Sequence, residues 1–285
     1  MANVYEIVTE RILDQLKKGV VPWKETWKSE SPRNISGRPY HGINLLLLGM
    51  MSYCNPYWLT FKQISELGGK IKKGEHASIV VYWNVKELEN ESEEKDNPKK
   101  QFLLFYYRVF NFEQCEFPDE IVEKYKTEKV SNFNSNEKFD EVLNSYKDKP
   151  KIIHSDVIRS PYYSPSEDII KIHNPEKFNN TNYYYSALSH ELIHSTGHES
   201  RLDRKLKGQL FDEDKYSKEE LIAEIGACFI KNICNIKEED NFKDSVSYIN
   251  SWIEKLKNDH RLIVHASNNA SKAVDYMLDK KEENL

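Results

Sequence analysis

The sequence predicts an α+β fold in two domains. Helices alternate with strands rich in β-branched and aromatic residues in the first part, and a polar, charged stretch over 116–149 follows. A small group of strands and then several amphipathic helices come after that stretch. The 285 residues are enough for two domains, and we expect them at 1–128 and 150–285, with 129–149 as the linker.

Spacing and caps predict the elements of the first domain. Apolar residues recur at helical spacing between Val4 and Leu16, and Thr60 with Gln63 forms a capping box that opens another helix. Residues 86–100 hold five Glu and one Asp against four Lys, so we expect a solvated insertion between two strands. In order, we expect a helix over 4–18, a turn over 34–40, an apolar helix over 43–53, the capped helix ending at 68–69, a basic turn over 70–74, and strands over 78–83 and 101–112.

The second domain should place a small sheet ahead of its helices. Runs of β-branched residues, which predict strands, come first in this domain, and stretches with the apolar spacing of amphipathic helices come last. The expected elements are strands over 152–158 and 162–172, the second broken by a turn, a helix over 181–196, a polar loop over 201–215, and helices over 217–234, 245–256 and 265–278.

A metal-binding motif marks the first helix of the second domain. Residues 190–194 read H-E-x-x-H, and positions i and i+4 of a helix lie one above the other on the same face. His190 and His194 can therefore hold one metal ion, and Glu191 can serve as the general base that activates a water. Capping residues at 180–181 and Gly197 beyond the motif are the ends that such a helix needs.

A catalytic zinc ion usually has three protein ligands and one open position, so a third ligand is required. The pattern of three-histidine sites would place it at Ser200, which is no histidine. On the next helix, Glu220 and Glu224 are four apart and share a face, and we assign Glu220 to the metal and Glu224 to orienting a ligating histidine. The reverse stays open, because Ser217 and Glu220 also read as a capping box, which would leave Glu224 as the ligand. We expect zinc, with manganese or another divalent ion as the alternative.

Composition argues for an ordinary cytoplasmic protein. No apolar run approaches the length of a membrane span, so we expect no membrane partner. The first residues carry acids and lack the shape of a signal peptide, which excludes a secreted protease toxin. The four cysteines have no C-x-x-C spacing and are expected to be free thiols.

Charge and tryptophan are unevenly spread along the chain. The formal net charge is −5, yet residues 1–85 hold 11 Lys and Arg against 7 Asp and Glu. Four of the five tryptophans, at positions 23, 27, 58 and 83, lie in this basic part. Basic and aromatic residues together are typical of surfaces that bind single-stranded nucleic acid.

Many short motifs occur in a fixed order along nearly the whole chain. In the first domain they are S-G-R-P-Y-H-G-I-N over 36–44, W-L-T-F-K-Q over 58–63, Gly68–Gly69, K-G-E over 73–75 and Y-R-V-F-N over 107–111. In the second they are Ser189–His194 with Gly197–His198, Arg201–Leu202 and Glu219–Gly226. On these residues the chain resembles the ArdC-type antirestriction proteins of conjugative plasmids and related mobile elements.

The resemblance implies an N-terminal domain that binds single-stranded DNA, shared with some plasmid primases, and a C-terminal zincin-like metallopeptidase domain. It implies a role in helping incoming DNA to survive host restriction. Each candidate DNA contact also has a structural role open to it, in the core, in a turn or cap, or on a solvated surface. The residues that we predict to contact DNA are Trp23, Arg38, Tyr40, Asn44, Lys62, Gln63, Lys72, Lys73 and Trp83.

Two functions remain open at this point. In the first, the protein binds DNA and its second domain is an active zinc peptidase with an unknown protein target, which would pair with the edge strand near Tyr162 and Tyr163. In the second, the protein protects DNA by occupying it, and the metal site is only structural. Glu191 favours the first, because a structural site needs ligands but no general base.

Overall fold

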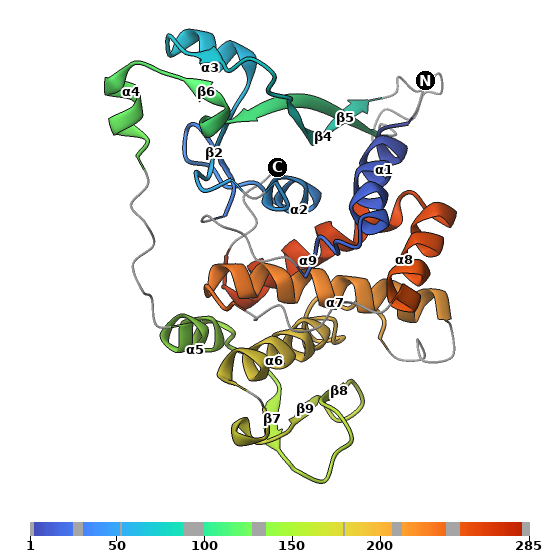
Figure 1. Cartoon of the computed structure of the whole chain (residues 1–285). Coiled ribbons are helices and arrows are strands. Elements are labelled where there is room, and N and C mark those ends of the chain that lie inside the picture. Colours follow the sequence, from blue (N-terminus) through green and yellow to red (C-terminus); the bar gives the residue numbers. More distant parts are fainter. Residues whose placement is uncertain are drawn as a thin grey trace.

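The computed structural model describes residues 3–24, 31–51, 53–87, 100–126, 135–178, 180–206, 213–237 and 246–280. Trp27, most of the expected insertion over 86–100 and part of the polar loop over 201–215 lie outside these described residues. The remainder forms two domains of mixed helix and sheet (Figure 1). None of the described helices is both long and apolar enough to cross a membrane.

A twisted sheet with short helices around it makes up the first domain. Its strands run in the order β1-β2-β5-β4, and β4 and β5 form a long antiparallel hairpin in which Ser78 lies opposite Val109. A second, two-stranded sheet pairs β3 with β6. The strands are β1 (Arg33–Asn34), β2 (Tyr57–Leu59), β3 (Lys70–Ile71), β4 (Ser78–Glu87), β5 (Lys100–Asn111) and β6 (Cys115–Glu116). The helices are α1 (Val4–Lys17), α2 (Ile43–Gly49), α3 (Phe61–Glu66), α4 (Asp119–Lys124) and the 3-10 turn η1 (Phe112–Gln114).

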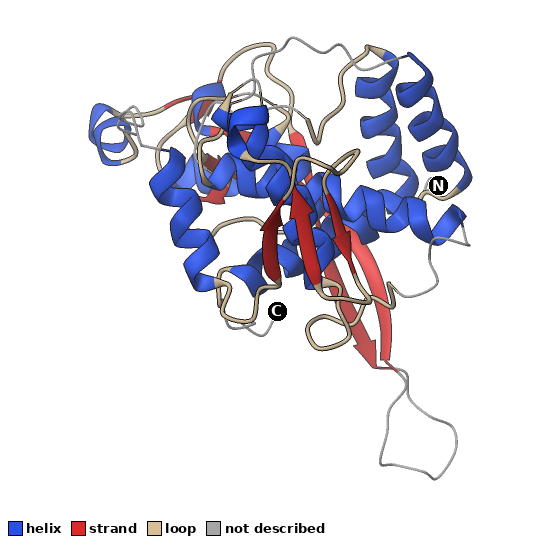
Figure 2. Cartoon of the chain, turned by 90° about the horizontal axis from the view of Figure 1, so that it is seen from below, coloured by secondary structure: helices blue, strands red, loops and turns tan. Residues whose placement is uncertain are grey.

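The second domain places a three-stranded sheet beside its helices (Figure 2). The central strand β9 is parallel to β7 and antiparallel to β8, which leaves β8 at the edge. The strands are β7 (Lys151–His154), β8 (Tyr162–Ser164) and β9 (Ile169–Ile172). The helices are α5 (Ser135–Ser145), η2 (Pro175–Lys177), α6 (Thr181–Thr196), α7 (Glu213–Ile233), α8 (Val246–Asn258) and α9 (Leu262–Met277).

One hydrophobic core connects the two domains. Val8 and Ile12 of α1 and Leu46 and Leu47 of α2 belong to the same buried cluster as residues of α6, α7, α8 and α9. Gly42 lies at this junction, where its backbone N–H donates to Ser271 Oγ at 2.7 Å. It has φ of 57°, and a Cβ there would lie 2.0 Å from Asn268 Oδ1, so this close approach requires glycine. The first two helices therefore rest directly on α8 and α9, and α9 packs in turn on α6 and α7, which hold the candidate site.

Two expected boundaries are wrong. The stretch expected as a linker over 129–149 contains α5, because Phe139, Val142 and Tyr146 line one helical face and are buried in the main core. The apolar helix expected over 43–53 ends at Gly49. The capping box of Thr60 and Gln63 is confirmed, since each side chain bonds the other residue's backbone N–H.

Candidate metal centre and nucleic-acid interface

Helix α6 positions the H-E-x-x-H motif. The side chain of Asn180 caps its start by accepting from the Tyr183 N–H at 3.1 Å, and Gly197 follows its last residue. Leu188 and Leu192 are buried and hold the helix against the core. The motif thus lies in the last two turns of a helix that is fixed at its start and along its inner face.

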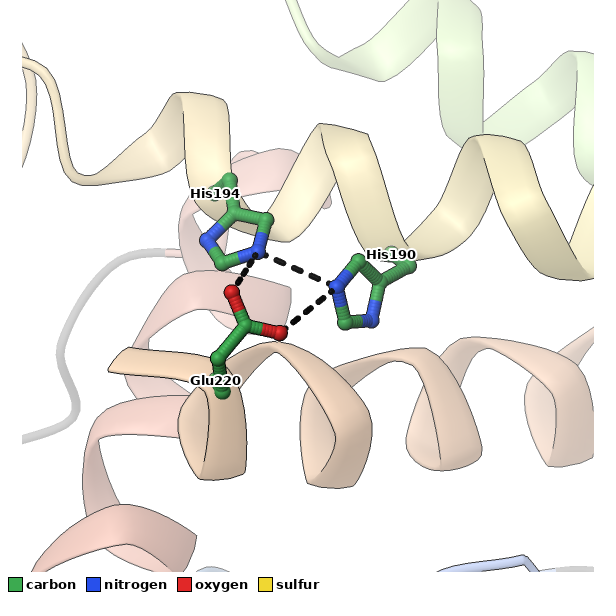
Figure 3. A group of neighbouring side chains, drawn as sticks. All are labelled: His190, His194 and Glu220. Carbon is green, nitrogen blue, oxygen red and sulfur yellow. Dashed lines mark hydrogen bonds and ion pairs between the residues drawn. The ribbon is translucent and has the colours of Figure 1, made fainter. Parts of the chain in front are cut away.

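His190 and His194 meet Glu220 of the neighbouring helix α7 (Figure 3). The two Nε2 atoms are 3.1 Å apart. Glu220 places one carboxylate oxygen 3.5 Å from His190 Nε2 and the other 3.5 Å from His194 Nε2. Tyr216, four residues before Glu220, donates its hydroxyl to that carboxylate.

This donor set fits a divalent metal ion. Nitrogen and oxygen ligands at about 2.0–2.2 Å in a tetrahedral arrangement lie roughly 3.3–3.5 Å from one another. The three separations in the cluster, 3.1, 3.5 and 3.5 Å, are close to these values. All three side chains are only partly buried, so one side of the cluster is open to solvent. Two imidazoles and one carboxylate with an open side match a catalytic rather than a closed structural site.

The charges around the cluster favour a cation. Burial lowers the pKa of His194, but hydrogen bonds to Glu219 and Glu220 outweigh it and raise the pKa to about 10. Burial raises the pKa of Glu220, yet its bonds to His190 and His194 hold that pKa below the ordinary value. The carboxylates therefore stabilise a positive charge at the position where the three side chains converge.

Glu219 orients His194, a role that sequence reasoning gave to Glu224. Glu219 is buried and its Oε1 lies 3.2 Å from His194 Nδ1, the nitrogen that faces away from the cluster. Arg204 fixes this carboxylate with two bonds of 2.7 and 3.0 Å. The guanidinium of Arg204 also donates to Ile193 O and Thr196 Oγ1, which ties it to α6. Carboxylates in this position set the tautomer and ring angle of a ligating histidine.

The assignment of Glu224 is wrong, both as the orienting carboxylate and as the alternative ligand. Its Oε2 accepts from Trp23 Nε1 at 2.6 Å and from the Tyr248 hydroxyl, away from the histidines. The capping-box alternative for Glu220 also fails, because α7 begins at Glu213 and Ser217 lies inside the helix. Ser217 Oγ instead accepts from Lys255 Nζ at 2.8 Å.

Glu191 lies beside the cluster and is 8% exposed. Burial raises its pKa, while the neighbouring His194 and His190 and a hydrogen bond from the Tyr163 backbone act in the opposite direction. The effect of the Tyr163 backbone places the edge strand β8 next to this carboxylate. A carboxylate held beside the site but outside the ligand set is what a general base requires.

A partly buried ion pair attaches the sheet to the end of α6. Arg201 pairs with Asp168 in the turn between β8 and β9 and donates to Ser195 O at 2.8 Å. Tyr163 of β8 donates its hydroxyl to Asp168 at 2.7 Å. Burial raises the pKa of Asp168, but the bonds from Arg201 and Tyr163 outweigh it and lower the pKa below its ordinary value.

We predict that Asp168→Asn lowers the free energy of unfolding by about 3 kcal/mol at neutral pH, because Arg201, with a side chain that is 2% exposed, loses its charged partner. Asparagine tolerates the positive φ of 50° at this position. A depressed carboxyl pKa contributes stability above the unfolded value of about 3.9, and this stability is lost as the pH falls below it. Urea unfolding should therefore show a difference between variant and wild type at neutral pH that shrinks below about pH 4.

Asp203→Asn, which removes an exposed pair with Lys205, is the control and should change stability little. A pH-independent loss would contradict the assigned ion pair.

Three of the residues predicted to contact DNA are buried or hydrogen-bonded within the protein itself. Trp23 is 1% exposed and bonded to Glu224, so no base can stack on it and its prediction is wrong. Asn44 bonds both Val81 N and Val81 O at 2.7 Å, which satisfies the outer edge of β4. The Gln63 side chain accepts from the Thr60 N–H at 2.8 Å as part of the capping box.

The other predicted contacts lie at the surface or partly so. Tyr40 packs on the buried cluster of Trp58 and Val80, and Trp83 is 41% exposed on the side of the hairpin that meets Tyr5 of α1. The four basic candidates are exposed, and two of them have partners nearby: Lys62 pairs with Glu66 and Lys72 donates to Glu113 O. The basic residues are Arg38, Lys62, Lys72 and Lys73.

Comparison with known proteins covers both domains. Residues 2–110 match the family model of the N-terminal domain of anti-restriction factor ArdC, and residues 140–269 match a zincin-like metallopeptidase model. The chain is 29% identical to a DNA primase TraC of Escherichia coli over 99% of its own length, but spans only 27% of that protein. With the zincin-like match, the His190–His194–Glu220 cluster supports a divalent metal site in the second domain.

Solved structures show the same fold. The metal-free structure of the antirestriction ArdC protein from plasmid R388 is 33% identical, with a TM-score of 0.77 over 98% of this chain and 97% of that one. The Mn(II)-bound structure of that protein gives 31% identity and a TM-score of 0.75 over 100% of both chains. The chain therefore belongs to the ArdC family of antirestriction proteins, with an ArdC N-terminal domain followed by a zincin-like domain.

Proposed function

We propose that the protein is an antirestriction factor of a mobile element that binds single-stranded DNA through residues 1–112 and carries a zinc-dependent peptidase site. The observation that carries the proposal is the cluster of His190, His194 and Glu220, with Glu191 beside it, in a chain that begins with an ArdC N-terminal domain. The TraC primase that the chain resembles acts on nucleic acid by its name, which agrees with a DNA-binding first domain.

The second domain supplies the parts of a peptidase site. The Nε2 atoms of the two histidines and the carboxylate of Glu220 would hold the zinc ion, and Glu219 with Arg204 would keep His194 in position. When bound, zinc supplies a Lewis acid that lowers the pKa of water to about 7 and polarises a carbonyl. Glu191 would take up the proton on its carboxylate and deliver it to the nitrogen of the leaving amine. An extended peptide would pair with the open edge of β8, whose Tyr163 lies next to Glu191.

The second candidate is a DNA-binding protein whose metal site is structural. The placement of the ligands on two helices favours it, because an ion there would join α6 to α7. Protection would then come from covering the DNA, and the peptide target required by the first candidate would not exist.

We predict that the full chain binds a single-stranded oligonucleotide more tightly than a duplex of the same length, with little sequence preference. Fluorescence anisotropy at increasing salt tests this, since each phosphate contact on a single strand adds about 0.7 to the slope of log Kd against log salt. If Arg38, Lys62, Lys72 and Lys73 each contact a phosphate, Kd should rise about 50-fold between roughly 50 and 200 mM salt.

Single substitutions test which lysines take part. Lys73→Ala should reduce the salt slope by about 0.7, whereas Lys177→Ala, an exposed lysine of the second domain, should leave it unchanged. Equal affinity for duplex and single strand, or a slope altered only by Lys177→Ala, would contradict the assignment of DNA binding to the first domain.

A further inference from the structure

The β4–β5 hairpin carries three exposed aromatic rings on one face. Tyr82 lies opposite Phe105, and Tyr107 lies opposite Val80, two residues away along each strand, so the three side chains share a face. They are 45%, 39% and 39% exposed for Tyr82, Phe105 and Tyr107 respectively. The ring centroid of Tyr82 is 5.7 Å from that of Phe105, with 24° between the planes, and 5.8 Å from that of Tyr107. The rings form one continuous aromatic surface.

The main core of the protein packs against the opposite face of the hairpin. Ile79 and Val81 alternate with the aromatic positions and are buried in the main core, toward α1 and α2. Figure 1 shows β4 and β5 near the top of the molecule, below α3, with α2 beneath them and α1 below their right-hand end. The three rings therefore lie on the face of the hairpin that is turned away from the main core.

The rings are held in place at one end. Val80 and Val109, on the same face, are buried with Trp58 below the rings. Tyr40 packs on this cluster, and burial together with the neighbouring Tyr107 hydroxyl raises the pKa of its own hydroxyl. A surface whose lower edge is anchored in this way loses little conformational entropy when a ligand binds.

The chemistry of this face fits single-stranded nucleic acid better than a protein. Among the described residues of the hairpin, the exposed large hydrophobic side chains are all aromatic, with no exposed aliphatic residue among them. Residues 31–87 and 100–111 hold nine Lys and Arg against three Asp and Glu, a charge of +6 in a chain whose net charge is −5. Arg38 is exposed two residues before Tyr40. Flat rings on a positively charged domain are complementary to the bases and phosphates of an unpaired strand.

We propose that Tyr82, Phe105 and Tyr107 form a platform on which bases of single-stranded nucleic acid stack. The proposal rests on the proposed function and assigns its binding surface to residues that were not among the predicted DNA contacts. The phosphates of the strand would run past the basic residues of the first domain, of which Arg38 stands nearest in sequence to the ring of Tyr40. Because every base has a π-face, stacking here would be tolerant of sequence.

Anisotropy with an oligothymidine of roughly 20 nucleotides tests the platform in the full chain. Tyr82→Ala and Phe105→Ala should each raise Kd roughly 5- to 150-fold, the effect of losing one base–aromatic stack. Phe105→Tyr keeps the ring and should bind as wild type does. The matched control is Tyr106→Ala, because Tyr106 lies on the same strand, is 40% exposed and faces the opposite way, so its loss should leave Kd unchanged.

The outcomes separate the platform from the proposed function. Wild-type binding that survives both alanine substitutions would overturn the platform and leave DNA binding intact. A wild type that binds no single strand would overturn both. If the alanine variants unfold at a lower temperature than wild type, Tyr82→Leu and Phe105→Leu keep apolar bulk on the sheet and allow the same comparison. If light scattering shows that the substitutions dissociate an oligomer without changing Kd, the face is a protein interface and the platform is wrong.

Discussion

Purified His190→Ala should contain no bound divalent ion after dialysis against limiting zinc, while the wild type should retain one ion per chain. Removing one of three ligands leaves the two remaining groups, His194 and Glu220, with too few donors for a tight site. An ion bound only to the folded protein stabilises it by about 2.7 kcal/mol when its concentration is 100 times its Kd. Thermal unfolding in the presence of zinc should therefore occur at a lower temperature in the variant, and chelation should lower the wild type to the same level.

A graded series of carboxylate variants makes this prediction sharper. Glu220→Ala should lose the metal as His190→Ala does, and Glu219→Gln should weaken metal affinity by about 10- to 100-fold, since Glu219 acts only through His194. Glu224→Gln is the control, because Glu224 bonds Trp23 and Tyr248 and should leave metal content unchanged. Equal metal content in wild type and His190→Ala, or metal loss only in Glu224→Gln, would show that the ion lies elsewhere.

The part of the site that depends on local spacing could be predicted from the sequence. His190 and His194 share a helical face by their i, i+4 spacing, and the structure brings them within 3.1 Å. The choice between Glu219, Glu220 and Glu224 depends instead on how α7 is rotated about its axis against α6. That rotation is set by tertiary packing, including the side chain of Ile193, which lies 2.8 Å from where a Cβ on Gly226 would be. No local pattern encodes it.

The role of Arg204 is a second feature of the site that could not be predicted from the sequence. It lies in a stretch that reads as a polar loop without a period, yet it bonds Glu219, Thr196 and Ile193 at once. An arginine that follows a metal motif has no spacing rule of its own, because the chain between them is irregular. Its role could be recognised only once the carboxylate of Glu219 was in place.

The proposed nucleic-acid surface could likewise be predicted only in part from the sequence. Alternation along 78–83 and 101–112 predicts two faces for the hairpin, but it does not say which face meets solvent. The packing of α1 and α2 against Ile79 and Val81 decides this and leaves Tyr82 and Phe105 outside. Tryptophan content pointed to Trp23, which the shared core of the two domains buries. Composition therefore indicates which domain binds DNA, but long-range packing decides which of its aromatic residues are exposed.

We predict that Glu191→Gln keeps its metal, its fold and its affinity for single-stranded DNA. Glutamine has nearly the volume of glutamate, and Glu191 lies outside the set of ligands, so neither packing nor coordination should change. It cannot accept the proton, so any hydrolysis of an unfolded protein substrate should fall by about 10²- to 10⁴-fold. Glu224→Gln, a partly buried carboxylate away from the histidines, should retain activity.

Transfer of unmethylated DNA into a restricting host decides what this chemistry is for. We expect Glu191→Gln to protect as well as wild type, because a protein that covers single-stranded DNA blocks a nuclease without cutting anything. That result would assign protection to the first domain and make the base of the second domain dispensable for it. If the variant binds metal and DNA normally yet fails to protect, hydrolysis is required, and the open edge of β8 beside Glu191 becomes the place to look for the protein that is cut.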